Sequence, residues 1–248
     1  MSKRSVVKVY MRIVPLAALY LCLAACGPST AQDNRAQNPS PEKSTEESTE
    51  KSTEEKWQWP AQDKTAEVSE AAKPLVAAAR KRLDALVVYD GRYVGIDYPG
   101  GDVPATMGVC TDVVIRSLRK AYDFDLQVAV HEDMKANFRL YPTTWGHRGP
   151  DKNIDHRRVP NLEVYFARAG YEVPITQNPK DYLPGDIVAW RLDAGSGTGG
   201  PPHIGIVSDR LSREGTPLII HNIGGGVEES DMLFRHRITG HYRYQADS

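Results

Sequence analysis

The sequence contains little cysteine: of its 248 residues only Cys22, Cys26 and Cys110 are cysteines. Small exported domains that depend on disulfides carry several cysteine pairs, so this chain is not a disulfide-stabilised scaffold. It also lacks an excess of charge of either sign, with 31 Lys and Arg against 32 Asp and Glu. The basic residues are scattered along the chain rather than clustered. We therefore expect no nucleic-acid partner.

The apolar stretch near the N-terminus, from Ile13 to Leu23, is too short to cross a bilayer comfortably and contains Pro15. It follows a basic start and ends in small residues, which is the pattern of a secretory signal. The segment Leu23-Ala24-Ala25-Cys26-Gly27 is similar to a bacterial lipobox, whose cysteine is acylated and becomes the mature N-terminus. We predict that residues 1–26 are a lipoprotein signal peptide with lipidation at Cys26. The alternative is an ordinary cleaved signal with a chance cysteine.

Residues 27–56 have almost no apolar side chains. They include a four-residue polar repeat that begins with Ser44-Thr45-Glu46-Glu47 and continues to Glu55. Such a segment cannot bury enough surface to offset the entropy of ordering it, so we predict a disordered tether. As a random coil it reaches about 30 Å, which holds a domain near its membrane. The remaining residues, 57–248, are enough for one domain with a hydrophobic core.

The periodicity of apolar residues in this domain predicts helices first and strands afterwards. The expected helices are residues 74–87, 110–122, 125–137 and 161–169. A short strand is expected at 93–97 and a long loop at 140–159. The later expected strands are residues 186–191, 203–209, 218–223 and 234–244. This order favours an α+β fold in which N-terminal helices pack on an antiparallel sheet.

Cys110 is the one cysteine of the predicted domain. A lone thiol in an exported protein is either buried and inert or retained for chemistry, and the cysteine count leaves both open. Cys110 opens a predicted helix, where unpaired N–H groups and the positive end of the helix dipole favour the thiolate. The same N–H groups can stabilise an oxyanion formed by attack on an amide carbonyl.

Two histidines are candidates for the base that such a thiol needs. His203 opens the apolar segment His203-Ile204-Gly205-Ile206-Val207, and His221 lies in Ile220-His221-Asn222. Each has an ordinary explanation, as a polar strand end and as a core or edge histidine. If the two strands are antiparallel neighbours, however, the imidazoles come adjacent and one can hold the tautomer of the other.

These motifs follow one another in a recognisable order. Gly108-Val109-Cys110-Thr111-Asp112, Pro184-Gly185-Asp186-Ile187-Val188-Ala189-Trp190 and the two histidine segments resemble the NlpC-type cell-wall peptidases of the papain-like superfamily. More closely, residues 75–244 resemble a bacterial branch of exported proteins labelled a domain of unknown function. The resemblance implies a papain-like (NlpC-type) fold, with Cys110 as nucleophile, His203 as general base and acid, and His221 as the residue that orients His203. Asn222 is the second candidate for that orienting role.

Several polar residues are candidates for substrate binding. The loop 140–159 is rich in groups that form hydrogen bonds, and arginine pairs well with carboxylates, so the loop is a candidate site for an acidic peptide stem. The alternative is a solvated loop with its own salt bridges. The loop's hydrogen-bonding residues include Asn153, Asp155 and Arg158, and its candidates for the site are Trp145, His147, Arg148, His156 and Arg157. Asp97, Tyr98 and Asp102 are added because they shortly precede Cys110, and Asn222 because it follows His221.

The sequence thus predicts an enzyme: a cell-envelope cysteine hydrolase that cleaves an amide bond, most plausibly in peptidoglycan stem peptides, through a thioester on Cys110. We expect a monomer without cofactor or metal, lipid-anchored at Cys26, in the outer membrane facing the periplasm. Metal-dependent hydrolysis is a weaker hypothesis because the sequence has no HExxH or comparable ligand pair. The other alternative is a non-catalytic envelope lipoprotein that binds cell-wall fragments or a protein partner.

Overall fold

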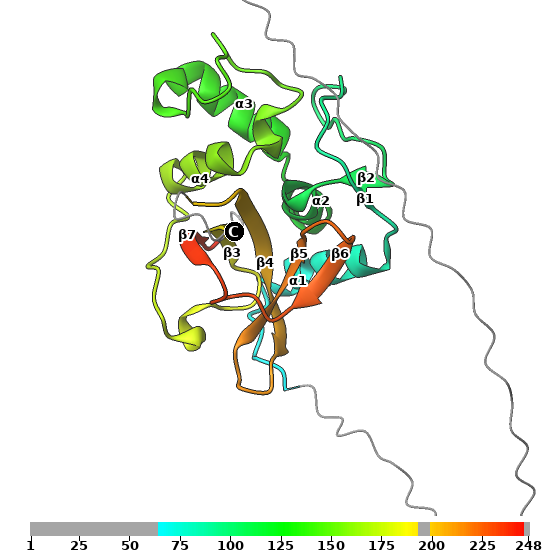
Figure 1. Ribbon diagram of the computed structural model, residues 1–248, viewed down its shortest axis with the longest axis vertical. Helices are drawn as coiled ribbons and strands as arrows, with labels where there is room; N and C mark the ends of the chain where they lie inside the picture. Colours follow the sequence, from blue (N-terminus) through cyan, green and yellow to red (C-terminus); the bar gives the residue numbers. More distant parts are fainter. Residues whose placement is uncertain (1–63, 193–198, 246–248) are drawn as a thin grey trace, which may run out of the picture. The chain divides into compact units, whose positions relative to one another are not determined.

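The computed structural model describes residues 64–192 and 199–245 (Figure 1). The predicted signal peptide, the lipidation site at Cys26 and the predicted tether lie outside the described residues. Within the described ranges, no helix combines the length and the apolar character needed to cross a membrane.

Four α-helices precede the strands of the main sheet along the chain. They are α1 (Lys73–Arg80), α2 (Cys110–Tyr122), α3 (Leu126–Asn137) and α4 (Val159–Arg168). Short 3-10 helices lie at η1 (Lys81–Asp84), η2 (Phe138–Leu140), η3 (Asp155–Arg157) and η4 (Pro179–Asp181). Local chemistry sets the boundary between α2 and α3: Asp123 ends α2 in a left-handed conformation with φ 54°, and the Asp125 side chain caps α3 by accepting the Gln127 N–H at 3.0 Å.

The strands form two sheets. They are β1 (Val88–Tyr89), β2 (Met107–Gly108), β3 (Ile187–Arg191), β4 (Pro202–Leu211), β5 (Pro217–Asn222), β6 (Val227–Ser230) and β7 (Arg237–Tyr242). The main sheet has five antiparallel strands in the order β6-β5-β4-β3-β7, and β1 and β2 pair in parallel. The predicted α+β class with an antiparallel sheet is confirmed.

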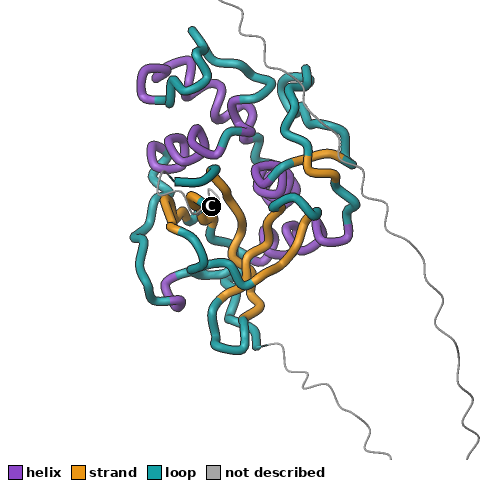
Figure 2. Tube along the Cα trace, in the orientation of Figure 1, coloured by secondary structure: helices purple, strands orange, loops and turns teal. Residues whose placement is uncertain are grey.

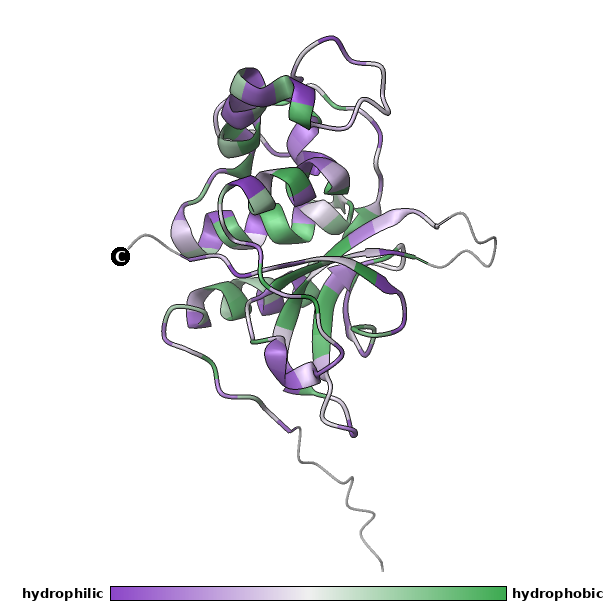
Figure 3. Cartoon of the chain, turned by 90° about the vertical axis from the view of Figure 1, so that its left-hand side faces the viewer, coloured by the Kyte–Doolittle hydropathy of each residue, from purple (hydrophilic) through white to green (hydrophobic). Residues whose placement is uncertain are grey.

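Alternating side chains give the main sheet two buried faces. On one face, residues such as Ile187, Ile204 and Ile206 pack with apolar residues of all four helices, and α2 lies against β4 and β5 (Figures 1 and 3). On the opposite face, Trp190 and Val207 pack under loop residues that include Tyr182, Met232 and Leu233. The start of α2 is thereby fixed against the middle of the sheet.

The structure differs from the sequence-based expectation in four places. The helix expected over 74–87 ends at Arg80 and continues only as η1, and residues 93–97 form no strand. Instead the backbone at Ile96 donates to the Asn153 side chain at 3.0 Å, so this segment is held by the long loop rather than by a sheet. Strands β1, β2 and β6 were not expected because they are only two to four residues long. The segment 140–159 is a loop apart from Leu140, which ends η2, from η3 and from the first residue of α4 (Figure 2).

Candidate functional site

Cys110 is the first residue of α2, and its side chain is buried with 4% exposure. Two side chains of the same helix turn hold this helix start in place. The Asp112 carboxylate accepts the Val109 N–H at 2.6 Å, which satisfies a donor that the helix leaves unpaired. The Thr111 hydroxyl donates to the Arg157 carbonyl at 3.2 Å. The thiol therefore projects from a rigid turn.

A buried ion pair joins this turn to the segment before α4. The Arg157 guanidinium binds Asp112 through two hydrogen bonds, at 3.0 and 2.9 Å, and both residues are almost fully buried. Arg157 also approaches the backbone carbonyl of Asp90 at 3.4 Å. One guanidinium thus links α2, the long loop and the end of β1 around the thiol.

The immediate surroundings of the sulfur mix favourable and unfavourable effects on the thiolate. Burial raises the pKa of the Cys110 thiol to about 11, although backbone hydrogen bonding at Ile204 and Thr111 and the nearby Tyr89 side chain oppose that rise. The helix start favours the thiolate, as expected, because the Thr111 backbone lowers the pKa, but this effect is smaller than that of burial. Desolvation outweighs the N–H groups at the helix start, and Cys110 rests as a neutral thiol.

The two candidate histidines lie side by side on neighbouring antiparallel strands, as the sequence predicted. His203 Nε2 lies 2.9 Å from His221 Nδ1, and each residue is 1% exposed. His221 Nε2 lies 2.7 Å from Ser230 Oγ and 3.3 Å from a carboxylate oxygen of Glu228. Because a carboxylate only accepts, the proton of His221 belongs on Nε2. His221 Nδ1 then accepts from His203 Nε2–H, which leaves the lone pair of His203 on Nδ1.

Both imidazoles are neutral in the folded protein. Burial lowers the pKa of His203 to about 3, with a further lowering from His221 and His236, and burial lowers the pKa of His221 to about 4. The ring of Trp190, on the adjacent strand β3, lies 6.0 Å from that of His203. The pair is thus almost completely shielded from water, in part by Trp190.

The backbone on either side of His203 lies near the thiol, although the imidazole itself does not line the cavity. Ile204 presents its backbone to the sulfur, and Pro202 lines the same cavity as Cys110. Among the described residues, the thiol and the His203 imidazole form no hydrogen bond with each other. The resting arrangement therefore brings together the two histidines and places the thiol against the strand end that carries His203.

The cavity beside Cys110 has a volume of about 250 Å³. This is slightly below the range of pockets for drug-sized ligands and leaves room for a small part of a peptide. Its lining residues are Tyr89, Gly91, Val109, Cys110, Trp145, Ile154, Arg157, Arg158, Val159, Pro160 and Pro202. The cavity therefore opens between the start of α2, the start of α4 and the end of β1.

Only part of the predicted substrate-binding set of the long loop reaches this cavity. Trp145 lines it, and His147 reaches it indirectly through a 2.8 Å contact with Arg158. Arg148 is exposed and does not line it. The prediction is wrong for His156, which is buried and has a pKa lowered to about 4 by burial. Arg157 does line the cavity, although two of its guanidinium nitrogens bind Asp112.

The candidates chosen for their closeness in sequence to Cys110 lie elsewhere. Asp102 forms an ion pair with Arg116 at 2.8 Å, the Tyr98 hydroxyl bonds Glu132 at 2.9 Å, and the Asp97 carbonyl accepts from Gln127 at 2.8 Å. These three predictions are corrected: Asp97 and Tyr98 contact α3, Asp102 contacts α2, and none of the three residues lines the cavity.

Asn222 is also corrected as a contact of His203 or of the cavity. It is fully buried, and its side-chain oxygen accepts the Gly224 N–H at 3.2 Å. The ring nitrogen that contacts His203 belongs to His221.

Two polar residues of the cavity, Tyr89 and Arg158, were not chosen as site residues from the sequence. Tyr89 approaches the thiol, and its own pKa is raised to about 12 by burial and by Cys110. Its signal was the short β-prone run Val87-Val88-Tyr89, which is too brief to identify a strand. Arg158 was recognised as a hydrogen-bonding residue of the loop 140–159, but its position directly before Val159-Pro160, a helix-start pattern, was not used to place it at the mouth of a helix.

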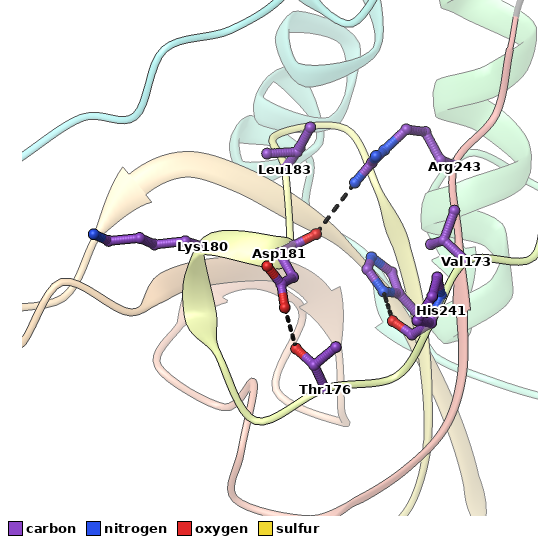
Figure 4. A pocket seen from close by; sticks show the side chains of 8 residues that line it. Val173, Thr176, Lys180, Asp181, Leu183, His241 and Arg243 are labelled. Atoms are coloured by element: carbon purple, nitrogen blue, oxygen red, sulfur yellow. Dashed lines mark hydrogen bonds between the residues drawn. The ribbon is translucent and has the colours of Figure 1, made fainter.

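A larger cavity, of about 380 Å³, lies beside the C-terminal part of β7 and holds no cysteine in its lining (Figure 4). Its most buried polar group, His241, has both ring nitrogens occupied, by the Pro174 carbonyl at 2.9 Å and by Asp186 at 2.8 Å. Arg243 also binds Asp186, at 2.7 and 2.8 Å. These hydrogen bonds connect His241 and Arg243 to Asp186, which directly precedes β3, so we assign them a structural role. In the described ranges, no group of three or more His, Cys, Asp or Glu side chains is arranged to hold a metal ion.

The fold and site define an α+β domain with a cysteine at a helix start and a histidine pair on the adjoining sheet. Residues 76–244 match the family described as Domain of unknown function (DUF1287), and the chain belongs to this family. It is also similar to Uncharacterized protein YijF of Escherichia coli (strain K12), with 55% identity over 166 residues, which are 67% of this chain and 78% of that protein. The assignment to the NlpC-type peptidases is therefore wrong, because DUF1287 is a distinct family.

Proposed function

We propose that this protein is a cysteine hydrolase that cleaves an amide bond through a thioester on Cys110. The observation that carries the proposal is the conjunction of three features at one place. A lone cysteine at a helix start lines a cavity, its sulfur faces the backbone of Ile204, and the preceding residue, His203, contacts His221 at 2.9 Å. A nucleophile, a base and an orienting group are the three parts that covalent amide hydrolysis requires.

In this mechanism His203 is the general base. Its Nε2 is engaged by His221, so Nδ1 takes the proton of the thiol as the sulfur attacks the carbonyl carbon. The protonated His203 then gives that proton to the departing amine, which leaves a thioester on Cys110. Water attacks the thioester, assisted again by His203, and releases the acid. His221 acts as a positioning residue that fixes the tautomer of His203.

The neutral resting state makes proton transfer part of the attack. With the thiol pKa at about 11 and the His203 pKa at about 3, a stable thiolate–imidazolium pair does not form before the substrate binds. The oxyanion is stabilised by backbone N–H groups at the start of α2 and by the Tyr89 hydroxyl, which already lies beside the sulfur. For the fold, we propose a papain-like arrangement, in which a helix carries the thiol and the adjoining antiparallel sheet carries the histidine.

The proposed substrate is a peptidoglycan stem peptide in the cell envelope. The support is the N-terminal sequence: a signal-like segment ending at Cys26, followed by a polar tether, fits an enzyme anchored by lipid in the outer membrane and working in the periplasm. We propose that it acts as a monomer, needs no cofactor and does not act on nucleic acid.

One observation favours a second candidate function. The thiol is neutral and only 4% exposed, which also suits a cleft that binds cell-wall fragments, or a protein partner, without cleaving them. Replacement of Cys110 separates the two, because turnover requires the sulfur and binding does not.

The experiment uses the chain from residue 27 onward and its Cys110→Ala variant, each incubated with digested peptidoglycan. We expect new fragments, heavier by one water across an amide, from the native protein alone. The His203→Ala variant should be nearly inactive, whereas replacement of the partly exposed His131 on α3 should leave the rate unchanged. Equal fragments from native and Cys110→Ala proteins would refute the cysteine mechanism. Binding without fragments would favour the non-catalytic candidate.

A further inference from the structure

The cavity beside Cys110 has an unusual charge balance. Its lining contains two arginines, Arg157 and Arg158, and no Asp or Glu. Two helix N-termini also meet there, because Cys110 begins α2 and Val159 begins α4. Helix N-termini and arginine both favour a negatively charged ligand. Each guanidinium also pairs with a carboxylate outside the lining, Arg157 with Asp112 and Arg158 with Asp155, so the cavity offers a negatively charged ligand the N–H groups that these pairs leave unused.

The two arginines differ in how their N–H groups are engaged by other protein groups. Arg157 gives its guanidinium edge to Asp112 in a doubly hydrogen-bonded pair, so it neutralises a buried carboxylate of the protein itself. Arg158 donates to Asp155 at 3.1 Å through Nη1 and contacts His147 Nε2 at 2.8 Å through Nη2. A guanidinium carries five N–H groups, so within the described part of the chain three N–H groups of Arg158 remain for a ligand.

Arg158 is also held in one orientation. Its guanidinium carbon lies 4.1 Å from the centre of the Trp145 ring, a cation–π contact, and Trp145 lines the same cavity. Because arginine only donates, the contact with His147 requires the lone pair of His147 Nε2 to face the guanidinium. Stacking on one side and hydrogen bonds at the edge reduce the entropy lost when a ligand binds.

We propose that Arg158 binds a free carboxylate of the substrate next to the carbonyl group that Cys110 attacks. This inference rests on the proposed function and deepens it: the substrates are peptides with a free carboxyl group close to the cleaved amide, and the same peptides with that group amidated are poor substrates. Arg158 determines specificity through its fork of N–H groups, while Trp145 and His147 position it.

The test compares Arg158→Met with Arg148→Met, a matched control on the same loop whose side chain is exposed and outside the cavity. The substrates are peptidoglycan stem peptides in free-acid and amidated forms. For the native protein and for Arg148→Met we expect kcat/KM to be higher for the free acid by about tenfold to a hundredfold, the usual value of a charge-assisted hydrogen bond. For Arg158→Met we expect that preference to fall to about one, mainly through loss of turnover of the free acid.

A binding measurement separates this inference from the proposed function. Calorimetry measures the affinity of two proteins, Cys110→Ala and the double variant Cys110→Ala/Arg158→Met. Each is titrated with the free-acid and with the amidated peptides. A preference for the free acid that Arg158→Met removes supports the inference even if the native protein cleaves neither form. If Arg158→Met cleaves the peptides with an unchanged preference for the free acid, the inference is overturned, whereas the proposed cysteine hydrolase activity is supported.

Arg158 directly precedes α4, so folding of the variants needs its own check. If Arg158→Met does not fold, Arg158→Lys decides the question. Lysine keeps the charge and the apolar stem but loses the planar fork, so the preference should drop several-fold. A preference equal to that of the native protein in a folded Arg158→Lys variant would count against recognition by the guanidinium fork.

Discussion

The reactivity of Cys110 with an alkylating reagent should rise steeply with pH. Burial raises the pKa of this thiol from its ordinary 9.0 to about 11, so the thiolate fraction at pH 7 is about one in ten thousand. An ordinary thiol would be about one per cent ionised at that pH, so burial alone lowers the reaction rate about a hundredfold, before restricted access is counted. The logarithm of the rate should therefore increase by about one for each pH unit between pH 7 and pH 10.

The assay is the rate of iodoacetamide addition, followed by intact mass. In the chain from residue 27 onward Cys110 is the only cysteine, so every adduct reports on it. The same chain in denaturant provides the ordinary-thiol control. Tyr89→Phe should slow the reaction further, because the Tyr89 side chain favours the thiolate. A rate that is already constant between pH 5 and pH 8 would refute the reasoning, because it would reveal a preformed thiolate–imidazolium pair.

Three further predictions concern stability. Asp112→Asn should lower the free energy of unfolding by about 3–5 kcal/mol in denaturant titrations, because it leaves Arg157 buried and unpaired; an unchanged midpoint would contradict this. The pKa values of His203 and His221 fall from 6.5 in the unfolded chain to about 3 and 4 in the folded one, so the unfolded state binds more protons below pH 6.5. Stability should be full above pH 6.5 and fall by as much as about 2.7 kcal/mol per pH unit between pH 6 and pH 4.5, and replacing both histidines with Gln should flatten that slope. Gly205→Ala should cost about 1–3 kcal/mol in thermal unfolding, since the new Cβ would lie 2.6 Å from Cγ2 of Ile219 and 3.0 Å from the Cβ of His221, both on β5. An unchanged melting temperature would show that β5 moves to accept the methyl group without cost.

The parts of the fold that follow from local periodicity were predictable. The helix over 110–122 has the bounds expected from its apolar spacing, and the strands around His203 and His221 were expected as neighbours from their closeness in the chain. The contact between the two imidazoles follows from antiparallel pairing, which the order of turn signals already indicated. Elements whose formation depends on neighbouring residues could therefore be predicted from the sequence.

The parts that depend on tertiary packing were not predictable from the pattern. Arg157 and Arg158 are adjacent in sequence, yet one is consumed by Asp112 and the other stacks on Trp145, and only the fold decides between them. The state of the Cys110 thiol depends on how deeply it is buried, which a position at a helix start does not reveal. The family assignment failed because short motifs around a cysteine and a histidine are shared by unrelated families.

The central claim is that Cys110 carries the acyl group of a cleaved amide. The most direct measurement is to stop the reaction of the native protein with peptidoglycan stem peptides in acid within milliseconds to seconds and to determine the mass of the protein. The account predicts an adduct with the mass of an acyl fragment, located on the peptide that contains Cys110, removed by hydroxylamine and absent from Cys110→Ser. Turnover by Cys110→Ser, or product formation with an adduct on a different residue, would contradict it.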